Sequence, residues 1–232
     1  MEYESILKLI DLAKHTALEA GRKISSKSNE LKEIQSVILS GKETKIKADE
    51  IMEDLIIRCL EKTGIPILSE ESGYINVNNN SNYVWIIDPL DGSLNFSRNS
   101  GPSAISIALW EDNNPVFGVI YLIDEHSIAW GGKQFGSWQN DIPITTSTIY
   151  NNNDAVLCTG IPSRFDKENK ETMNYFNQLI FNFSKVRMYG SAACSMVKVA
   201  TGSAEAYWEE DIMIWDVAAG IPIVIGATGI VK

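Results

Sequence analysis

Hydrophobic residues recur at helical spacing in the first part of the chain. Over residues 3–27 the apolar side chains stand three or four positions apart, which predicts an amphipathic helix: Ile6, Leu9, Ile10, Ala13, Ala17 and Ala20. A mixed polar stretch follows at about residues 28–44. The helical pattern returns in KADEIMEDLIIRCLEKTG, residues 47–64, and Gly64 stands where a C-cap glycine would end this second helix.

Shorter apolar runs bounded by turn residues predict strands in the middle of the chain. Glycines in the last of these runs predict a further hairpin. The strand-bearing runs are IPILSEESG (65–73), YVWIID (83–88), SAISIALW (103–110), PVFGVIYLID (115–124), SIAWGG (127–132) and GGKQFGSWQNDIPI (131–144), with a polar loop, NVNNNSN (76–82), between the first two.

Strands and helices alternate from about residue 155 onward. The predicted elements are a strand in AVLCTGI (155–161), a helix over 167–182, a strand in KVRMY (185–189), a helix opening at Ser191, a strand in AEAYWE (204–209) and a final helix beginning near Trp215. No internal repeat is evident. The whole pattern predicts an α+β or α/β fold, in which helices are layered on mixed sheets within a single domain over 1–232, with a soft seam near residues 140–154.

Composition narrows the possible partners. Hydrophobic residues make up 44% of the chain and charged residues 22%, as in ordinary globular proteins. No apolar run approaches the ~18 residues of a membrane span, and the N-terminus lacks the apolar core of a signal peptide, so we expect a cytoplasmic protein without a membrane partner. The net charge of −10 argues against nucleic acid as a partner but permits an anionic substrate beside metal ions.

Few residues are available for histidine or thiol chemistry. The chain has two histidines, His15 and His126, which argues against a histidine-rich zinc site and against a Ser-His-Asp triad. The three cysteines are far apart and form no CxxC pair, so we expect reduced core thiols: Cys59, Cys158 and Cys194.

The segment VWIIDPLDGSLNF (84–96) places Asp88 and Asp91 three positions apart at the end of an apolar run. A proline and a glycine within it predict a tight turn that aims both carboxylates and the carbonyl of Leu90 at one point. These hard oxygen ligands are the kind that Mg²⁺ or Mn²⁺ prefers. Gly92 and Ser93 are then expected to open a short helix whose free N–H groups form an anion cradle.

Two other segments add acids to this motif. Glu70 and Glu71 end the preceding strand, and if the two strands are neighbours in one sheet their acidic ends converge. Asp216 begins the last helix within IWDVAAG (214–220). Taken singly, these features are also typical of a solvated acidic pair, a helix-dipole residue and a plain turn. Together they resemble a metal cage assembled from distant parts of the chain.

The motif DPLDGSLNF, with the upstream Glu-Glu pair and the downstream WDVAAG (215–220), resembles the inositol monophosphatase family of Mg²⁺-dependent, lithium-sensitive phosphatases. The resemblance runs in order along the chain and includes KADE (47–50) and GSAA (190–193). It implies a layered α-β-α-β-α sandwich of the sugar-phosphatase type, with a metal and phosphate half before the seam and a substrate half after it. It also implies a homodimer, Mg²⁺ as cofactor with Mn²⁺ as a possible substitute, and inhibition by Li⁺.

The resemblance also assigns roles to residues of this chain. Asp91 would bridge two metals. The ligands of the first metal would be Glu70, Asp88, the Leu90 carbonyl and Asp91, and Asp216 would be a further ligand of the second metal. The catalytic residues would be Glu70, Ser93 and Asp49. The contacts to the phosphate or the substrate would be Gly92, Ser93, Ala192 and Glu209.

The implied reaction is hydrolysis of a phosphate monoester on a small polyol or sugar, with two metals about 4 Å apart binding the attacking water and the leaving oxygen. Glu70 would orient or deprotonate that water, assisted by Ser93 through Asp49. Fructose-1,6-bisphosphatase activity, alone or as a second activity, is the alternative, and a nucleotidase ranks third. A catalytically inactive Mg²⁺-binding regulatory homologue is the alternative from another class. The sequence lacks a P-loop and a G-x-G-x-x-G motif, and aspartates three apart do not fit the haloacid-dehalogenase type.

Four departures from the family pattern stand out. Serine stands at position 93, where threonine is more frequent, and keeps the hydroxyl. Pro222 falls within the predicted last helix, where it is expected to kink the rod. GATG (226–229) replaces the usual EAGG. Family members normally continue for tens of residues beyond Lys232; either this is a short member, or those terminal strands and helix come from a partner subunit or are missing from this chain.

Overall fold

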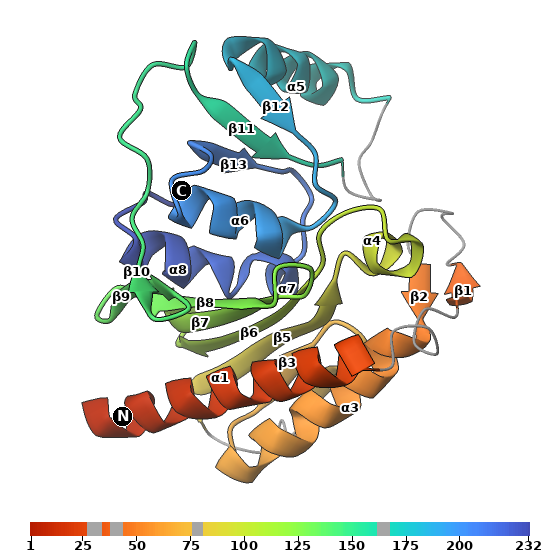
Figure 1. The fold of residues 1–232 in the computed structure, drawn as a ribbon, viewed down its shortest axis with the longest axis vertical. Helices are drawn as coiled ribbons and strands as arrows, with labels where there is room; N and C mark the ends of the chain where they lie inside the picture. Colours follow the sequence, from red (N-terminus) through yellow and green to blue (C-terminus); the bar gives the residue numbers. More distant parts are fainter. Residues whose placement is uncertain (27–33, 38–43, 76–80, 162–167) are drawn as a thin grey trace.

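The computed structural model describes residues 1–26, 34–37, 44–75, 81–161 and 168–232. Within these ranges the chain forms alternating layers of helices and sheets (Figure 1). Helices α1 (Tyr3–Ser26) and α3 (Lys47–Leu60) cover one face of a large sheet, and α6 (Ala192–Ala200) and α8 (Gly220–Gly226) cover the other. A smaller sheet and α5 (Lys170–Asn182) lie beyond α6. The predicted α-β-α-β-α layering is confirmed.

The large sheet has eight strands in the order β10-β9-β8-β7-β6-β5-β3-β4. All neighbours are antiparallel except β3 and β5, which are parallel. The strands are β3 (Ile67–Ser69), β4 (Gly73–Ile75), β5 (Tyr83–Asp91), β6 (Ala104–Glu111), β7 (Asn114–Leu122), β8 (Ser127–Gly132), β9 (Gly136–Gln139) and β10 (Ile142–Pro143).

The small sheet is parallel, with β11 (Val156–Thr159) between β12 (Lys185–Arg187) and β13 (Ala206–Trp208). The segment from residue 144 to 155 connects the two sheets, and the predicted seam in this region stays a prediction. The polar stretch predicted at 28–44 contains a short strand, β1 (Ile34–Val37), that pairs with β2 (Thr44–Ile46); residues 27–33 and 38–43 lie outside the described residues. Residues 76–80 of the predicted polar loop and residue 167 of the predicted helix do so as well.

Strand residues alternate between two cores, as period-2 geometry requires. On β6, Ile105 and Ile107 face the α1 and α3 layer, whereas Ala104 and Ala108 face α6 and α8. Small residues on the second face let the helices approach closely. Gly118 shows how closely, because a Cβ built on it would lie 2.1 Å from a backbone oxygen of α8's N-cap residue.

The predicted single last helix is wrong, because the chain forms α7 (Ile214–Val217) and then α8. Pro222 falls in the first turn of α8, where a missing N–H breaks no helical bond within that segment. The carbonyl of Ala218, four residues earlier, accepts instead from the indole N–H of Trp110 at 3.0 Å. A side chain of β6 therefore replaces the donor that proline lacks, and the predicted kink becomes a break between two short helices.

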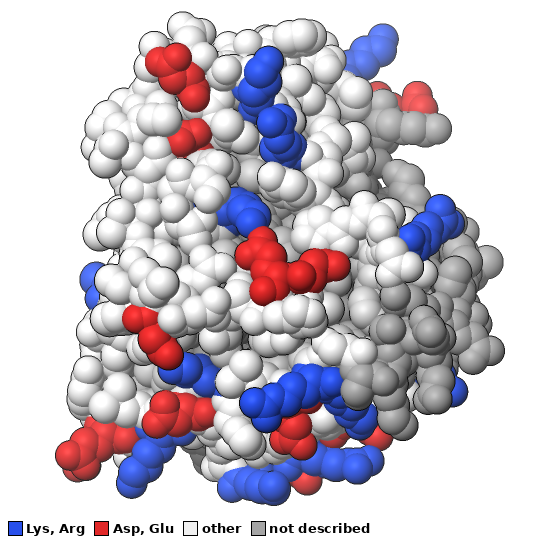
Figure 2. Space-filling model, in the orientation of Figure 1, with Lys and Arg blue, Asp and Glu red and all other residues white. Residues whose placement is uncertain are grey.

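The surface carries mixed charge on the face shown in Figure 2. Acidic and basic side chains alternate there, most densely over the α1 and α3 layer. The described part of this face therefore shows no continuous basic patch of the kind that binds a nucleic-acid backbone. Among the helices in the described ranges, none combines the length and apolar character that a membrane span requires.

Candidate metal centre

The parallel pairing of β3 with β5 brings two acidic strand ends together. Ser69 pairs with Ile87, so Glu70 follows directly beside Asp88. The N–H of Glu70 continues the ladder by donating to the carbonyl of Ile87 at 3.3 Å. The predicted convergence of these acidic ends is confirmed, because residues at the carboxyl ends of neighbouring parallel strands meet at one edge of the sheet.

The predicted tight turn at Asp88 is wrong, because β5 continues to Asp91 through a β-bulge. Asp88 pairs with Ser106 and Asp91 with Ala104, so two residues of β5 lie opposite one residue of β6. Pro89 occupies the bulge, where the absence of its N–H breaks no ladder bond. An extra residue in one strand re-aims the side chains that follow, which lets both carboxylates leave the sheet on one side.

The chain changes direction only at Gly92, whose φ of 82° lies in the left-handed region. A side chain there would also crowd the loop, since a built Cβ would lie 3.0 Å from the carbonyl oxygen of Pro102. Gly92 is the N-cap of α4 (Ser93–Arg98), so the predicted short helix is confirmed. Its first N–H groups lie directly beyond the two aspartates in the chain.

Asp216 reaches the same place from α7. Its Oδ2 accepts from the N–H of Met213 at 3.0 Å, which fixes the carboxylate at the start of that helix. One carboxylate oxygen each from Asp88, Asp91 and Asp216 lie within 4.8 Å of one another. Asp88 and Asp91 are buried and Asp216 is half-buried. Three hard carboxylate oxygens at this spacing fit a divalent cation such as Mg²⁺.

Burial and mutual repulsion perturb these carboxyl groups. Burial, then the charges of Glu70, Asp91 and Asp216, raise the pKa of Asp88 well above its usual value. Burial raises the pKa of Asp91 to about 6 against the lowering effect of its hydrogen bonds. Desolvation of its carboxyl group raises the pKa of Glu70 to about 8, against a lowering effect of Asp88 and with a further rise from the charge of Asp216. Bound divalent cations would offset this repulsion.

The carboxylate of Asp91 is held by the N-terminus of α6. Its Oδ2 accepts from Ser191 Oγ at 2.5 Å and from the N–H of Ala193 at 2.7 Å. Ser191 Oγ also accepts from the N–H of Cys194 at 3.2 Å, as an N-cap does. The backbone N–H of Ala192 contributes to the same carboxylate. Ala192, which the resemblance placed among the substrate contacts, therefore also faces Asp91 with its backbone.

The hydroxyl of Ser93 connects the two sides of the site. Its Oγ lies 2.8 Å from Asp49 Oδ1 and 2.8 Å from the carbonyl oxygen of Leu90. The other oxygen of Asp49 accepts from the N–H of Ile46 at 2.7 Å at the start of α3. Asp49 is buried, and the donors of Ile46 and Ser93 help to satisfy its charge.

Glu209 lies just beyond β13, within electrostatic reach of Asp91. Tyr207 donates from its hydroxyl to Glu209 Oε2 at 2.8 Å, and burial, then the glutamate charge, raise the pKa of Tyr207 so that it stays a donor. A Cβ built on Gly160 would lie 2.4 Å from the same oxygen. The missing side chain of Gly160 therefore makes room for the Glu209 carboxylate.

Two residues that position the site were not identified from the sequence. Ser191 was expected to open a helix, but its bond to an aspartate 100 positions away has no local signal. Asn95 donates from Nδ2 towards the carbonyls of Pro102 at 2.9 Å and Tyr189 at 2.7 Å. Asn95 thereby joins α4 to the loop before α6. Its place within the DPLDGSLNF motif is the one signal that could have pointed to it.

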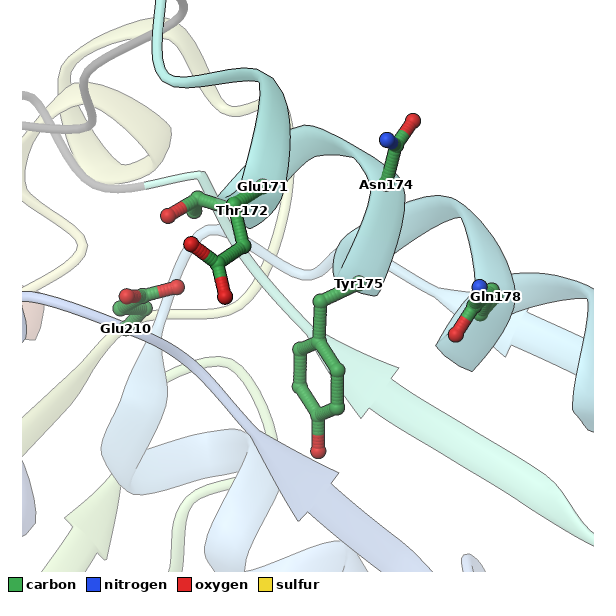
Figure 3. Close-up of a pocket in the computed structure, with 6 residues that line it drawn as sticks. All are labelled: Glu171, Thr172, Asn174, Tyr175, Gln178 and Glu210. Carbon is green, nitrogen blue, oxygen red and sulfur yellow. The ribbon is translucent and has the colours of Figure 1, made fainter.

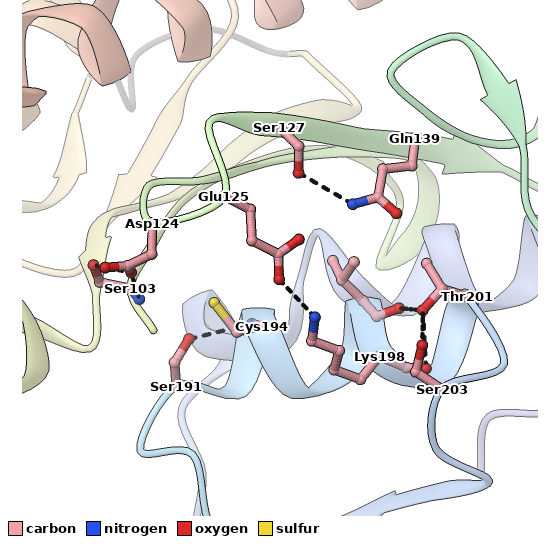
Figure 4. Close-up of polar contacts among 11 residues, drawn as sticks. Ser103, Asp124, Glu125, Ser127, Gln139, Ser191, Cys194, Lys198, Thr201 and Ser203 are labelled. Carbon is pink, nitrogen blue, oxygen red and sulfur yellow. Dashed lines mark hydrogen bonds and ion pairs between the residues drawn. The ribbon is translucent and has the colours of Figure 1, made fainter. Parts of the chain in front are cut away.

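The turn between β7 and β8 contacts α6 on the face of the large sheet (Figure 4). Lys198 Nζ on α6 lies 2.6 Å from Glu125 Oε1 on this turn. The neighbouring Asp124 accepts from both the backbone N–H and the hydroxyl of Ser103, at 3.0 and 3.3 Å. The ion pair therefore joins the turn to α6, and the Asp124 contacts join the same turn to the residue before β6.

A surface cavity on the outer layer is formed by other residues (Figure 3). It has a volume of about 670 Å³ and opens between α5 and the loop after β13. Its described lining residues are Glu171, Thr172, Asn174, Tyr175, Gln178 and Glu210. The three clustered aspartates are not among them, so this shallow polar cavity is separate from the candidate metal centre.

Comparisons with known proteins agree with this geometry. The sequence model of the inositol monophosphatase family matches residues 5–232. An inositol-1-monophosphatase from Synechocystis sp. is 34% identical over 227 residues, covering 96% of this chain and 78% of the relative. A fructose-1,6-bisphosphatase/inositol-1-monophosphatase from Aquifex aeolicus is 27% identical, with 98% of this chain and 86% of the relative covered. The crystal structure of the extragenic suppressor protein suhB from Bartonella henselae superposes with a TM-score of 0.87 at 29% identity, covering 95% of this chain and 85% of that one.

Proposed function

The chain belongs to the inositol monophosphatase family, and we propose that it hydrolyses a phosphate monoester of a small polyol or sugar with Mg²⁺ as cofactor. One observation carries the proposal. Three carboxylates from β5 and α7 lie within 4.8 Å of one another, next to a serine hydroxyl that is oriented by a buried aspartate. Mg²⁺ held there would supply Lewis-acid activation of water and neutralise charge on the phosphate.

Each residue has a defined task in this proposal. Asp88, Asp91 and Asp216 would hold the cation with their clustered oxygens, and Glu70 would complete the ligand set from the end of β3. The Leu90 carbonyl would add a neutral ligand, because the single proton of Ser93 lies toward Asp49 in this scheme and leaves the lone pairs of that oxygen free. Deprotonated carboxylates are needed for this task, so binding would release the protons that burial favours.

Ser93 and Glu70 would handle the proton of the attacking water. The proton of Ser93 Oγ can lie toward Asp49 Oδ1 at 2.8 Å, which leaves a lone pair of the hydroxyl to accept from that water. Glu70 would orient the same water from the end of β3. The N–H groups at Gly92 and Ser93, which open α4, would hold the phosphate oxygens. Glu209 would accept from a substrate hydroxyl beyond the phosphate.

Inositol monophosphate is our first choice of substrate, because the Synechocystis relative carries that activity in its name. Fructose-1,6-bisphosphate, alone or as a second substrate, is the alternative that the name of the Aquifex relative supports. The Bartonella relative is named as an extragenic suppressor, which keeps a non-catalytic regulatory role as the candidate from another class. The expected homodimer rests on the family resemblance, and light scattering in solution tests it.

Released phosphate from a panel of inositol, fructose and nucleotide phosphates tests the proposal. We expect Mg²⁺-dependent turnover of a polyol or sugar phosphate by the wild type and its loss in Asp88→Asn, with the fold retained. Asp141→Asn is the matched control, since Asp141 is an exposed acid in a turn, at a positive φ that asparagine tolerates. Full turnover in Asp88→Asn would refute the proposed metal role. Metal binding without turnover of any ester would favour the regulatory alternative.

A further inference from the structure

Glu53 is a buried carboxylate whose position the reaction scheme above leaves unused. It lies on α3 and is 6% exposed. A carboxylate taken out of water destabilises a fold unless donors surround it, and an apolar side chain at such a position is usually at least as stabilising. Stability alone therefore does not explain an acid at this point of the helix. The position of its hydrogen-bond partners does.

Within the described part of the chain, the hydrogen-bond donors to Glu53 come from one short turn. Oε1 accepts from Ser69 Oγ at 2.5 Å and from the N–H of Ser72 at 3.0 Å. Oε2 accepts from Ser72 Oγ at 2.8 Å. Ser69 ends β3 and Ser72 precedes β4, so the hydrogen-bonded residues flank Glu70 and Glu71 on both sides. Charge-assisted hydrogen bonds of this kind are short and directional, so they fix the turn against the helix.

Besides these hydrogen bonds, the turn is closed by the pairing of Ser69 with Gly73 in a short hairpin. The strands on either side are three residues long. Glu70 is joined to β5 by a hydrogen bond of 3.3 Å from its backbone N–H to the carbonyl of Ile87. It follows Ser69, which pairs with Ile87, so it lies beside Asp88, whose position is fixed inside the sheet. A small movement of the turn would therefore change the distance between Glu70 and the aspartate cluster.

The same helix fixes the other side of the site. Asp49 precedes Glu53 by four positions, so both side chains leave one face of α3 one turn apart, about 6 Å along the axis. Asp49 holds Ser93, whereas Glu53 holds the turn of Glu70. Like charges at this spacing disfavour a helix by themselves. The arrangement fits a helix that sets the separation between Glu70 and Ser93.

We propose that Glu53 is a positioning residue that acts through Glu70: it clamps the turn 69–72 so that the Glu70 carboxylate reaches the divalent cation at the aspartate cluster. This inference rests on the proposed function, because it takes Glu70 to be a ligand. It adds a residue that touches neither cation nor substrate. A positioning role differs from a purely structural one in a single prediction. The effect of Glu53 on metal affinity should disappear when Glu70 can no longer bind metal.

A double-mutant cycle on Mn²⁺ binding provides the test, with the free Mn²⁺ signal in electron paramagnetic resonance as the readout. We expect Glu53→Ala to weaken Mn²⁺ binding by about 10-fold or more, the usual effect of losing a partner that orients a ligand. In the Glu70→Gln background the same change should alter binding less than about twofold. Glu53→Gln should restore affinity to within about threefold, since its amide keeps an acceptor for Ser69 and the N–H of Ser72.

Two further variants keep the test decisive. Asp54→Ala on the exposed face of α3 is the matched control and should leave Mn²⁺ affinity unchanged. If Glu53→Ala fails to fold, Ser72→Ala removes one of the three hydrogen bonds from an exposed turn residue and replaces it in the cycle. Its expected loss is about three- to tenfold, again only when Glu70 is present.

Equal losses in both backgrounds, or no loss in either, would overturn the role of Glu53. Phosphate release by the wild type separates this result from the proposed function. A non-additive cycle without any turnover would refute the phosphatase proposal and leave the clamp standing. Turnover with an additive cycle would refute the clamp alone.

Discussion

The buried Asp91 predicts how the stability of the metal-free protein changes with pH. Burial raises its pKa from an ordinary value of 3.8 to about 6, because the hydrogen bonds from Ser191 and Ala193 offset only part of the desolvation. A carboxyl group with a raised pKa in the folded state stabilises the fold fully at a pH below its unfolded value. This contribution is lost as the pH rises through the folded value, so the relevant window is about pH 4 to 7.

The size of the effect follows from the two pKa values. Each pKa unit corresponds to about 1.4 kcal/mol, so the difference between 3.8 and about 6 is worth about 3 kcal/mol of unfolding free energy. Other carboxyl groups titrate in the same range, and subtracting the unfolding free energy of Asp91→Asn at each pH removes their contribution. The substituted amide still accepts from Ser191 but does not titrate. Relative to this variant, the wild type should lose about 3 kcal/mol between pH 4 and pH 7.

Urea unfolding at several pH values, in the presence of EDTA, measures this difference. Saturating Mg²⁺ should reverse the sign of this pH-dependent difference. A carboxylate must be deprotonated to serve as a ligand, and binding then stabilises the folded state. A difference between wild type and Asp91→Asn that stays constant with pH in EDTA would refute the reasoning. So would a wild type that gains stability relative to the variant as the pH rises without metal.

Three other outcomes are expected. Ser191→Ala removes both the N-cap of α6 and a hydrogen bond to the Asp91 carboxylate, so the unfolding free energy measured in urea should fall by about 2–4 kcal/mol. A fall below about 1 kcal/mol would speak against the role of Ser191 in holding Asp91. Gly160→Ala should raise KM for the polyol phosphate while Mn²⁺ affinity stays unchanged, because Glu209 must give way, and an unaltered KM would argue against Glu209 as a substrate contact. Treatment with EDTA should abolish phosphate release, Mg²⁺ or Mn²⁺ should restore it and Li⁺ should inhibit it; turnover that persists in EDTA would exclude metal assistance.

The sequence was sufficient for features that depend on local pattern. The helical spacing in residues 3–27 and 47–64 follows from a buried stripe, and both helices form where they were expected. The acidic ends of β3 and β5 converge because the runs before Glu70 and Asp88 are neighbouring parallel strands. A motif of glycine after two aspartates also sufficed to predict the start of α4.

Features that depend on distant partners were not accessible in the same way. A bulge and a tight turn share the same local residues, and the pairing of Asp88 and Asp91 with β6 decides between them. Pro222 could be recognised as a helix breaker, but the donor that replaces its N–H is Trp110, more than 100 positions away. Glu53 looks like one more acid on an amphipathic helix until the turn that it holds is seen.

A crystal soaked with Mn²⁺ and phosphate tests the central claim most directly. The claim is that acids from β3, β5 and α7 surround a divalent cation beside the first turn of α4. We expect an anomalous peak within about 2.5 Å of carboxylate oxygens of Asp88, Asp91 and Asp216, with phosphate next to it at Gly92 and Ser93. Anomalous density elsewhere, with these three carboxylates free of metal at saturating Mn²⁺, would contradict the account.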